Sequence, residues 1–549
     1  MESIHDEFLN ILQNKLKGGD LMNYQSKIVE YFTKTNKNIL LLYMKVGTGK
    51  TLTSLASAIT LIKLNSKLHN KFNKIIILSP KSVQHEFKSN LKLYQTFTEY
   101  NSNINNMIHM IAYNGNNAQE KFKKLNIKED AIFIIDELHL FLRSVIKVNL
   151  LEDQSKNNVG NCKKILDLIQ NCKNKRVLGL TGTPSAKMPF ELVPFFNLEP
   201  SINLPTNIEK FNELYVNQEK KCINNEEKLK KILKGTIVYV DKLDTQELKI
   251  SKSKNNSDLI EEEIEMSTEQ YKKYLKDYES ELNEVSFTNK KNIYGISFGV
   301  HSTFHSKTFQ DSIYVSELKG DYNKFIDSTH TPKIIKMYDD TKNIKGLCAF
   351  YFKFVDFGVK TMEAKLIKEG YSLFKTKSSS STVFNFQEEF KGKHYILFTG
   401  NESFQIRNKY KEIFNSKENK YGEYIKYIII SPSGSVGVTL KNVRYLGIGS
   451  VEFNYSMINQ IMGRVNRLNS HIDLPVKDRT LINKIYISTK NEKYYEKNKT
   501  KIDKICYRTT YNYENEKGLC IERIIYQDSL SDDIINEKFR EILKEISIL

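Results

Sequence analysis

The sequence predicts two α/β domains, each with a parallel sheet that is covered by helices on both faces. Short apolar runs rich in Ile, Leu and Val alternate with longer amphipathic stretches over residues 36–190, and this alternation resumes at residue 345. Runs of this kind are typical of parallel strands buried on both faces. Strand–helix alternation in turn predicts a doubly wound sheet. Polar groups directly follow several of the runs, where a sheet of this class binds its ligands.

A change of composition separates the two series. Residues 201–335 are rich in Lys and Glu, and we interpret them as an α+β insertion or bridge. Within them the sequence predicts a pair of strands, near residues 235–240 and 261–266. The expected organisation is an N-terminal helical segment (1–35), a first α/β domain (36–200), the insertion (201–335), a second α/β domain (336–500) and a small C-terminal extension (501–549). A final helix is predicted over residues 534–548, without obvious chemistry.

The composition is that of a globular protein with a basic surface. The chain has 549 residues, of which 40% are hydrophobic and 27% charged, and this length allows several domains with a core each. The formal net charge of +18 suits a polyanionic partner such as nucleic acid. An AT-biased genome, which favours Lys, Asn and Ile, explains the same charge equally well.

The cysteines and the N-terminus exclude several classes of protein. The six cysteines form no C-x-x-C pair and no Cys/His spacing typical of a metal site, so free thiols in a reducing compartment are expected. The first residues lack the basic and apolar regions of a secretory signal. No run of about 18 apolar residues occurs, so no transmembrane helix is expected.

The motif MKVGTGKT at residues 44–51 is the centre of the first domain. It follows the apolar run over 38–43 and precedes a helical stretch. A glycine-containing turn between a parallel strand and a helix aims backbone N–H groups and the positive helix end at one point, which makes a phosphate site. Lys50 can reach the β- and γ-phosphates, and the Thr51 hydroxyl can bind Mg²⁺. Met44 stands where the full pattern has glycine, so the signal is GxGKT in its strand–loop–helix context.

A pair of carboxylates follows another strand of this domain. The run AIFII at residues 131–135 ends in Asp136 and Glu137. Adjacent carboxylates at the end of a buried strand are costly unless a positive charge lies beside them. Magnesium with a nucleotide is the natural partner. Asp136 would hold the metal, directly or through water, and Glu137 would polarise the attacking water.

The strand over residues 176–180 ends in TGTP at 181–184. Small hydroxyl residues at this place could couple a nucleotide site to a moving neighbour. Taken alone, the tetrapeptide is explained equally well as a turn.

The second series of strands ends in a group of basic residues. The segment NQIMGRVNRLNSH at residues 459–471 predicts a helix that carries Gln460, Arg464 and Arg467 on one face. Two arginines on one face, with Gly463 giving close approach, suit a γ-phosphate clamp supplied by a second domain. Alone, this segment would be interpreted as a basic surface helix.

In this order, GxGKT, DELH, TGTP and QxxGRxxR resemble the motifs of superfamily 2 helicases and translocases of the DEAD/DEAH-box type. The resemblance covers residues 23–471 and implies two RecA-like domains with ATP and Mg²⁺ between them. It implies nucleotide binding by Gln25, Gly47, Thr48, Gly49, Lys50, Thr51 and Gly437, Mg²⁺ binding by Thr51 and Asp136, and hydrolysis by Lys50, Asp136, Glu137, Gln460, Arg464 and Arg467. Gln25 becomes an adenine contact. Candidates for nucleic-acid tracking or coupling are Ser79, Thr183, Ser431, Gly434 and Thr439.

A narrower resemblance is carried by ELVPFFNL at residues 191–198, FNSKEN at 414–419 and GRVNRLNSH at 463–471. These stretches resemble the poxvirus group of nucleoside triphosphatase I and the small subunit of the early transcription factor. The group extends to the helicase-like proteins of cytoplasmic linear (killer) plasmids in yeasts. Such proteins serve transcription of DNA outside the nucleus. The resemblance therefore implies a cytoplasmic location, DNA as a partner, and an RNA polymerase or other transcription proteins.

Three residues depart from the pattern of the group. Leu138 replaces the small residue of DEAH, Val436 stands where Glu is common, and Phe453 stands where Trp is common. None of them removes a catalytic group, so ATP hydrolysis is expected.

The leading hypothesis is an ATP- and Mg²⁺-dependent motor that acts on DNA during transcription of a cytoplasmic virus-like or plasmid genome. An RNA helicase is a second hypothesis, because His139 belongs to a motif shared with RNA-acting members. A third is a promoter- or polymerase-binding transcription factor subunit that uses ATP as a switch, without motor activity.

Overall fold

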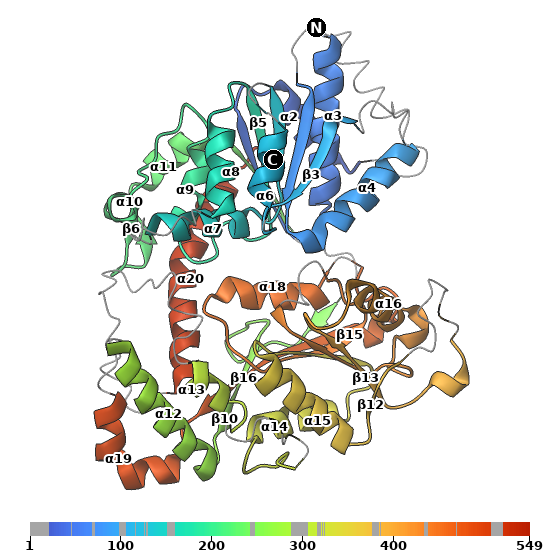
Figure 1. The fold of residues 1–549 in the computed structure, drawn as a ribbon, viewed down its shortest axis with the longest axis vertical. Coiled ribbons are helices and arrows are strands. Elements are labelled where there is room, and N and C mark those ends of the chain that lie inside the picture. Colours follow the sequence, from blue (N-terminus) through green and yellow to red (C-terminus); the bar gives the residue numbers. More distant parts are fainter. Residues whose placement is uncertain are drawn as a thin grey trace. The chain divides into compact units, whose positions relative to one another are not determined.

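The computed structural model describes the chain apart from residues 1–20, 46, 68–71, 98–105, 116, 126, 128–129, 151–159, 242–247, 287–305, 316–319, 321, 323, 376–383, 385, 433–437, 468 and 507–519. The chain divides into two compact units. The first comprises the residues up to 243 together with 531–549, and the second comprises 244–530. Figure 1 shows the elements of both units with their labels.

The first unit is a parallel α/β sheet with the strand order β3-β2-β4-β5-β1-β8. Its strands are β1 (Ile39–Met44), β2 (Lys74–Ser79), β3 (Ile108–Ala112), β4 (Ala131–Ile135), β5 (Lys175–Thr181) and β8 (Ile237–Val240), and a separate antiparallel pair is formed by β6 (Val216–Asn217) and β7 (Cys222–Ile223). Its helices are α2 (Asn23–Lys34), α3 (Lys50–Lys67), α4 (Gln84–Phe97), α6 (Ala118–Lys124), α7 (Leu138–Leu150), α8 (Asn161–Gln170), α9 (Val193–Phe196), α10 (Ile208–Tyr215) and α11 (Glu226–Leu233), with short 3₁₀ turns η1 (Lys81–Val83) and η2 (Pro189–Leu192).

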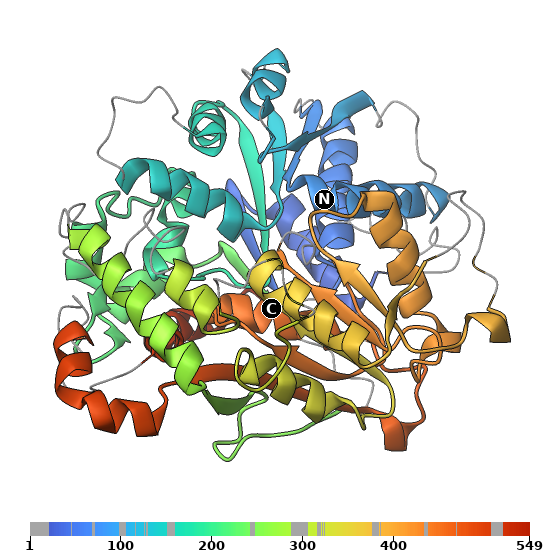
Figure 2. The same cartoon turned by 60° about the horizontal axis from the view of Figure 1, so that its bottom comes forward.

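The core of the first unit explains its apolar runs. Every residue of β1 is buried, because helices cover both faces of the sheet. Helices α2, α3 and α4 pack on one face, where Ile28, Ile59 and Phe87 meet alternate strand residues such as Leu40 and Leu42. Helix α8 contacts both α6 and α7. Figure 2 shows the sheet from a second direction.

The second unit has a larger parallel sheet with the order β10-β16-β15-β11-β14-β13-β12, and β9 also pairs with β16. Its strands are β9 (Lys249–Ile250), β10 (Ile260–Glu265), β11 (Leu347–Tyr351), β12 (Ser372–Leu373), β13 (His394–Phe398), β14 (Tyr427–Ile430), β15 (Val443–Ile448) and β16 (Thr480–Thr489). Its helices are α12 (Thr268–Ser286), α13 (Ser306–Asp311), α14 (Pro332–Thr341), α15 (Lys360–Lys368), α16 (Phe404–Phe414), α18 (Tyr455–Val465) and α19 (Glu492–Cys506), with η4 (Val355–Val359), η5 (Glu388–Phe390), η6 (Lys417–Asn419) and η7 (Val476–Asp478).

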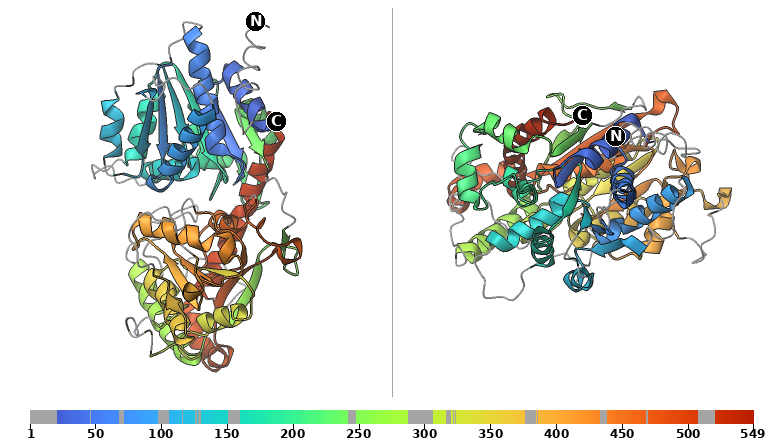
Figure 3. Two further views of the ribbon diagram at one scale, coloured as in Figure 1. Left: turned by 90° about the vertical axis from the view of Figure 1, so that its right-hand side faces the viewer. Right: turned by 90° about the horizontal axis from the view of Figure 1, so that it is seen from above.

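Helices also cover both faces of the second sheet, as the views in Figure 3 show. On one face, Ile334 and Met337 of α14 and Met362 of α15 pack against strand residues of β11, β14 and β15. The opposite core contains residues of α12, α16 and α18, among them Tyr271 and Ile458. The two predicted parallel-sheet α/β domains are therefore confirmed.

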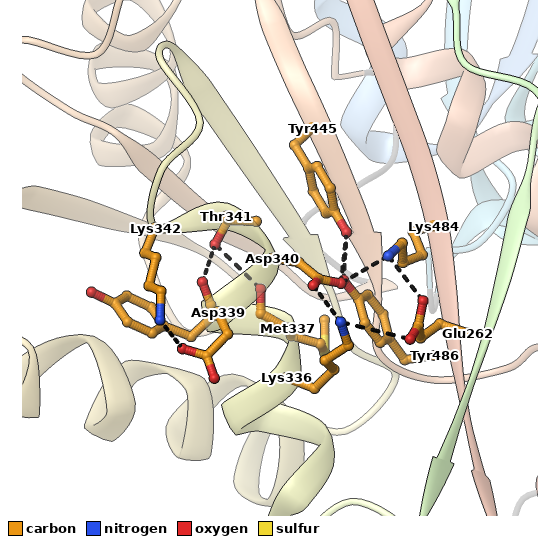
Figure 4. A network of polar contacts seen from close by, with 11 residues as sticks. Glu262, Lys336, Met337, Asp339, Asp340, Thr341, Lys342, Tyr445, Lys484 and Tyr486 are labelled. Carbon is orange, nitrogen blue, oxygen red and sulfur yellow. Dashed lines mark hydrogen bonds and ion pairs between the residues drawn. The ribbon is translucent and has the colours of Figure 1, made fainter.

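A partly buried polar network ties α14 to strand β16 of the second sheet (Figure 4). Asp340 accepts hydrogen bonds from the Tyr486 hydroxyl at 2.7 Å and from Lys484 Nζ at 2.9 Å. Its other carboxylate oxygen accepts from Lys336 Nζ at 2.6 Å. Burial alone would raise the pKa of Asp340, but these three donors lower it below its ordinary value. The network joins helix α14 to strand β16, and its satisfied donors and acceptors favour a single packing of the two.

The strand pairing corrects one sequence prediction. The strands expected as a pair near residues 235–240 and 261–266 both exist, as β8 and β10, but they do not pair with each other. Strand β8 pairs with β1 in the first sheet, and β10 pairs with β16 in the second. Each is an edge strand whose partner lies far along the chain, which local pattern cannot reveal.

The final helix is also longer than predicted. Helix α20 runs without a break from Ile521 to Glu545, whereas the sequence predicted a start at residue 534. Its residues up to 530 belong to the second unit and those from 531 to the first. None of the described helices is long and apolar enough to cross a membrane.

Candidate nucleotide site

The phosphate loop joins β1 to α3 as predicted. Lys50 is the first residue of α3, and its Nζ donates to the Met44 carbonyl oxygen at 2.9 Å. Thr51 follows in the same first turn and is partly buried. The Thr48 hydroxyl donates to the Lys45 carbonyl oxygen at 2.7 Å, which closes the loop. The lysine therefore lies along the loop, at the N-terminal end of a helix that favours an anion.

Two glycines give this loop its shape. Gly47 has φ +90° and Gly49 has φ +76°, and L side chains rarely adopt this conformation. A Cβ built on Gly49 would lie 2.5 Å from Gln25 Nε2. Gln25 is 5% exposed, and its Oε1 accepts a hydrogen bond from the Met22 backbone N–H at 2.9 Å. The close approach places the Gln25 amide beside the loop.

Asp136 is held at the end of β4, where its backbone N–H donates to the Leu78 carbonyl oxygen at 2.8 Å. Burial, followed by the adjacent carboxylate of Glu137, raises the pKa of Asp136 to about 8, while the charge of Lys50 lowers it. A divalent cation beside Asp136 and Glu137 would offset both the cost of burying the Asp136 charge and the repulsion between the two carboxylates. Asp136, with the Thr51 hydroxyl, thus fits a Mg²⁺–nucleotide complex.

The raised pKa has a measurable consequence for stability. The folded protein keeps a proton on Asp136 between pH 4 and pH 8, whereas the unfolded chain has lost it, so stability falls as the pH rises through this window. At pH 8, without Mg²⁺ or nucleotide, we expect Asp136→Asn to increase the free energy of unfolding by up to about 5 kcal/mol. The gain should shrink towards pH 5. Urea unfolding at both pH values measures it, with Asp167→Asn on the exposed face of α8 as the control. An equal effect at pH 5 and pH 8 would contradict the assignment.

Glu137 adopts a left-handed backbone conformation, with φ +47°. A residue other than glycine is strained there, by about 1–3 kcal/mol, and needs support from its surroundings. Tyr113 provides it, since its hydroxyl donates to the carbonyl oxygens of Asp136 at 3.3 Å and of Glu137 at 3.4 Å. Tyr113 is 4% exposed, and burial raises the pKa of its hydroxyl well above the ordinary value, so it stays a donor. No sequence motif marked Tyr113 as a functional residue, although its position directly after β3 was a signal.

A polar chain leads from the acidic pair to the TGTP segment. His139 Nδ1 lies 3.6 Å from Glu137 Oε2 and 3.1 Å from Thr181 Oγ1. Burial lowers the pKa of His139, which favours the neutral ring. The Thr181 hydroxyl also accepts from the Thr183 backbone N–H at 3.0 Å. The structure therefore connects the two motifs that the sequence placed at successive strand ends.

The departure at Leu138 has a packing partner. Leu138 is fully buried, and a Cβ built on Gly179 of β5 would lie 2.7 Å from its Cδ2. The absence of a side chain at Gly179 makes room for the leucine. The larger residue in DELH is thus accommodated without displacement of the acidic pair.

In the second unit, α18 carries part of the predicted arginine cluster. Asn454 begins the helix, and its side chain accepts from the Met457 backbone N–H at 2.9 Å. Gln460 and Arg464 lie one turn apart and are partly buried. The helix ends at Val465, so the prediction that Arg467 lies on its face is wrong.

Gly463 is in an open place on the same helix. A Cβ built on it would meet no described atom within 4 Å. The expected close approach at Gly463 is therefore not seen within the second unit.

Arg467 is positioned by the segment that precedes β15. Its Nη1 donates to the Thr439 hydroxyl. The backbone on both sides of Leu440 is held by Asn415, whose side chain donates to the Thr439 carbonyl oxygen and accepts from the Lys441 N–H, both at 2.8 Å. In the sequence, Asn415 stands out only as part of FNSKEN, without a role of its own. Its amide could have been singled out as a capping group after a helix.

The remaining predicted residues divide into three kinds. Ser79 is fully buried at the end of β2, with its hydroxyl turned away from solvent, and Ser431 is 1% exposed after β14. Thr183 lies beside Thr181. Gly434, Val436 and Gly437 lie outside the described residues.

Within the described part of the chain, no group of three or more His, Cys, Asp or Glu side chains could hold a metal. A magnesium ion that is bound together with a nucleotide needs fewer protein ligands.

Comparison with known proteins finds one family model and several viral relatives. The family described as "Type III restriction enzyme, res subunit" matches residues 18–186. The chain is 28% identical over 577 aligned positions to the "Termination factor NPH-I homolog" of African swine fever virus (isolate Pig/Kenya/KEN-50/1950), covering 93% of this chain and 76% of the relative. It is 26% identical to "Nucleoside triphosphatase I" of Choristoneura fumiferana entomopoxvirus, covering 85% of this chain and 72% of the relative.

Two solved structures are also similar. The "Sulfolobus solfataricus SWI2/SNF2 ATPase core in complex with dsDNA" is 17% identical with a TM-score of 0.33, covering 98% of this chain and 99% of that one. The "Pyrococcus furiosus Hef helicase domain" is 13% identical with a TM-score of 0.41, covering 89% and 100%.

The predicted resemblance is therefore confirmed. The chain resembles superfamily 2 helicase-type ATPases and, within them, the viral nucleoside triphosphatase I group. At this coarse level the likeness is to helicase-like nucleoside triphosphatases.

Proposed function

We propose that this chain is an ATP- and Mg²⁺-dependent ATPase that is stimulated by DNA and acts in transcription of a cytoplasmic virus-like or plasmid genome. The observation that carries the proposal is the assembly in the first unit of Lys50, Asp136 and Glu137 at the ends of β1 and β4. Relatives named as a termination factor and as a nucleoside triphosphatase support the role in transcription.

Each residue of the first unit has a distinct task in this proposal. Bound Mg²⁺ would supply positive charge to the phosphates and to Asp136. Lys50 exchanges its bond with the Met44 carbonyl oxygen for a phosphate oxygen. Glu137 orients the attacking water and accepts its proton. Thr51 completes the ligand set at the start of α3.

The second unit is proposed to contribute the remaining charge. Arg464 and Arg467 would stabilise the negative charge that develops on the transferred phosphoryl group, as an arginine finger does. Gln460 would orient the same phosphate or the water. The basic balance of the chain, with a net charge of +18, supports nucleic acid as the partner that stimulates hydrolysis.

The proposal is tested by steady-state ATP hydrolysis in four parallel reactions: without nucleic acid, with single-stranded DNA, with duplex DNA and with RNA. Glu137→Gln serves as the blank. We expect DNA to raise the rate more than RNA does, and the increase to disappear in the variant. If RNA stimulates hydrolysis more than DNA does, the nucleic-acid partner is RNA and the DNA assignment is wrong. Hydrolysis no faster than the blank in any reaction would leave a nucleotide-binding or scaffolding subunit and would overturn the proposal.

A further inference from the structure

Helix α20 is one unbroken helix whose two halves belong to different units (Figure 1). Nothing in the sequence motifs assigned it a role. Its N-terminal half is anchored in the second unit by a fully buried ion pair, in which Glu522 Oε2 lies 2.6 Å from Lys333 Nζ of α14. The same oxygen accepts from the Ser488 backbone N–H at 2.7 Å. Arg523 adds bonds to Glu261 and Glu263 of β10.

The C-terminal half is anchored in the first unit, directly after the TGTP segment. Ser185 is fully buried, and its hydroxyl donates to Asn536 Oδ1 at 2.5 Å. The Ser185 carbonyl oxygen accepts from Arg540 Nη1 at 2.9 Å. The hydroxyl and the carbonyl oxygen of Ser185 are thus held by neighbouring turns of α20. Asn536 is fully buried and Arg540 is 5% exposed.

The arginine is itself held in place. Its Nη2 donates to Asp533 at 2.7 Å and its Nε donates to Glu537 at 2.8 Å. A guanidinium with fixed partners on its own helix loses little further freedom when it binds a carbonyl oxygen. Arg540 is therefore pre-organised to receive the Ser185 backbone.

The segment that α20 holds is connected to the hydrolytic groups. The polar chain described above runs from Glu137 through His139 and Thr181 to Thr183, two residues before Ser185. The helix also lies beside the strand next to the phosphate loop, because Lys544 Nζ lies 5.6 Å from the centre of the Tyr239 ring of β8. The Val240 carbonyl oxygen of the same strand accepts from the Lys45 backbone N–H at 3.0 Å. The C-terminal half of α20 thus adjoins both motifs that follow β1 and β5.

We infer that Asn536 and Arg540 are positioning residues that make the hydrolytic groups of the first unit responsive to nucleic acid, and that α20 must be continuous for this response. This inference rests on the proposed function, since it concerns how that ATPase is stimulated. A helix is a stiff connection over its length, and buried contacts at both ends leave it little freedom to slip. A continuous α20 is the route by which a change at the Glu522 end would reach the Ser185 segment.

The experiment compares ATP hydrolysis with and without saturating DNA in Asn536→Ala, in Ser185→Ala, in the double variant and in wild type. We expect each single variant to reduce DNA stimulation about five-fold, and the double variant to reduce it no further, because both remove one shared bond. The rate without DNA should stay within about two-fold of wild type, since no group that contacts nucleotide is changed. Lys538→Ala, on the exposed side of the same helix, is the matched control.

A second variant separates coupling from local packing. Insertion of Gly-Gly-Ser after Leu530 keeps the contacts of both halves but breaks the helix between them. We expect this variant to unfold at the wild-type temperature and to lose stimulation as Asn536→Ala does. Stimulation that survives the insertion or the Asn536 substitution overturns the inference and leaves the proposed function intact. A wild-type chain that hydrolyses ATP at one rate with and without every nucleic acid overturns the proposed function, and this inference with it.

Discussion

Replacing Glu137 with glutamine is expected to lower kcat for ATP hydrolysis at least ~100-fold, the range by which general bases accelerate reactions. The substitution keeps the size of the side chain and removes its ability to accept a proton. Because Tyr113 supports the backbone of this turn through carbonyl oxygens, the left-handed conformation at residue 137 should persist in the variant. Nucleotide affinity should therefore change by no more than about three-fold, as for a group that acts mainly in the transition state.

Rapid-quench turnover and fluorescent nucleotide binding measure the two quantities separately. Glu120→Gln is the matched control, because it makes the same change on an exposed residue of α6 in the same unit. Retention of more than a tenth of the wild-type kcat in Glu137→Gln would assign the proton acceptor to another group.

Replacing Arg467 with alanine is expected to lower kcat about 10³-fold, the lower range for loss of an arginine that stabilises phosphoryl transfer. The guanidinium is oriented by its bond to the Thr439 hydroxyl, and Asn415 holds the backbone at that threonine. This support favours a fixed arginine over a mobile surface charge. Arg467→Lys should recover only a small part of the rate, because an ammonium lacks the planar fork.

Single-turnover hydrolysis with saturating Mg²⁺ and ATP measures this loss. Lys477→Ala removes a positive charge from the exposed η7 segment of the same unit and serves as the control. A fall in nucleotide affinity with kcat preserved would place Arg467 in ground-state binding instead. A fall in thermal stability of the second unit equal to that of Thr439→Val would assign it a structural role.

Local pattern was sufficient for the strands and for the motifs at their ends. Buried runs such as ILLLYM in β1 and AIFII in β4 can be recognised in the sequence. Both faces of a doubly wound sheet exclude water, so these strands are apolar at every position. The edge of the sheet where Lys50 and Asp136 meet also follows from chain order, since parallel strands place their carboxyl ends together. The departure of Leu138 from the DEAH pattern could be recognised in the sequence. The space that Gly179 leaves for the leucine could not.

The motifs could not predict the residues that act through contacts with the backbone. Tyr113 and Asn415 bind carbonyl oxygens and N–H groups of segments that are distant in sequence. Any residue type offers those backbone groups, so no pattern of side chains marks the partner. The end of α18 before Arg467 was missed for a related reason, because a heptad-like spacing can continue past the point where the helix ends.

The sequence alone determined the fold class, the resemblance to helicase-type ATPases and the residues of the phosphate loop and acidic pair, because each depends on short-range periodicity or on contiguous motifs. Tertiary structure decided which sheet receives β8 and β10, how α20 is divided between the two units, and why Ser185 is held by Asn536 and Arg540. These outcomes depend on burial and hydrogen bonding between segments up to 355 residues apart. The free energy of such contacts depends on the folded surroundings, so no periodic pattern in the sequence predicts them.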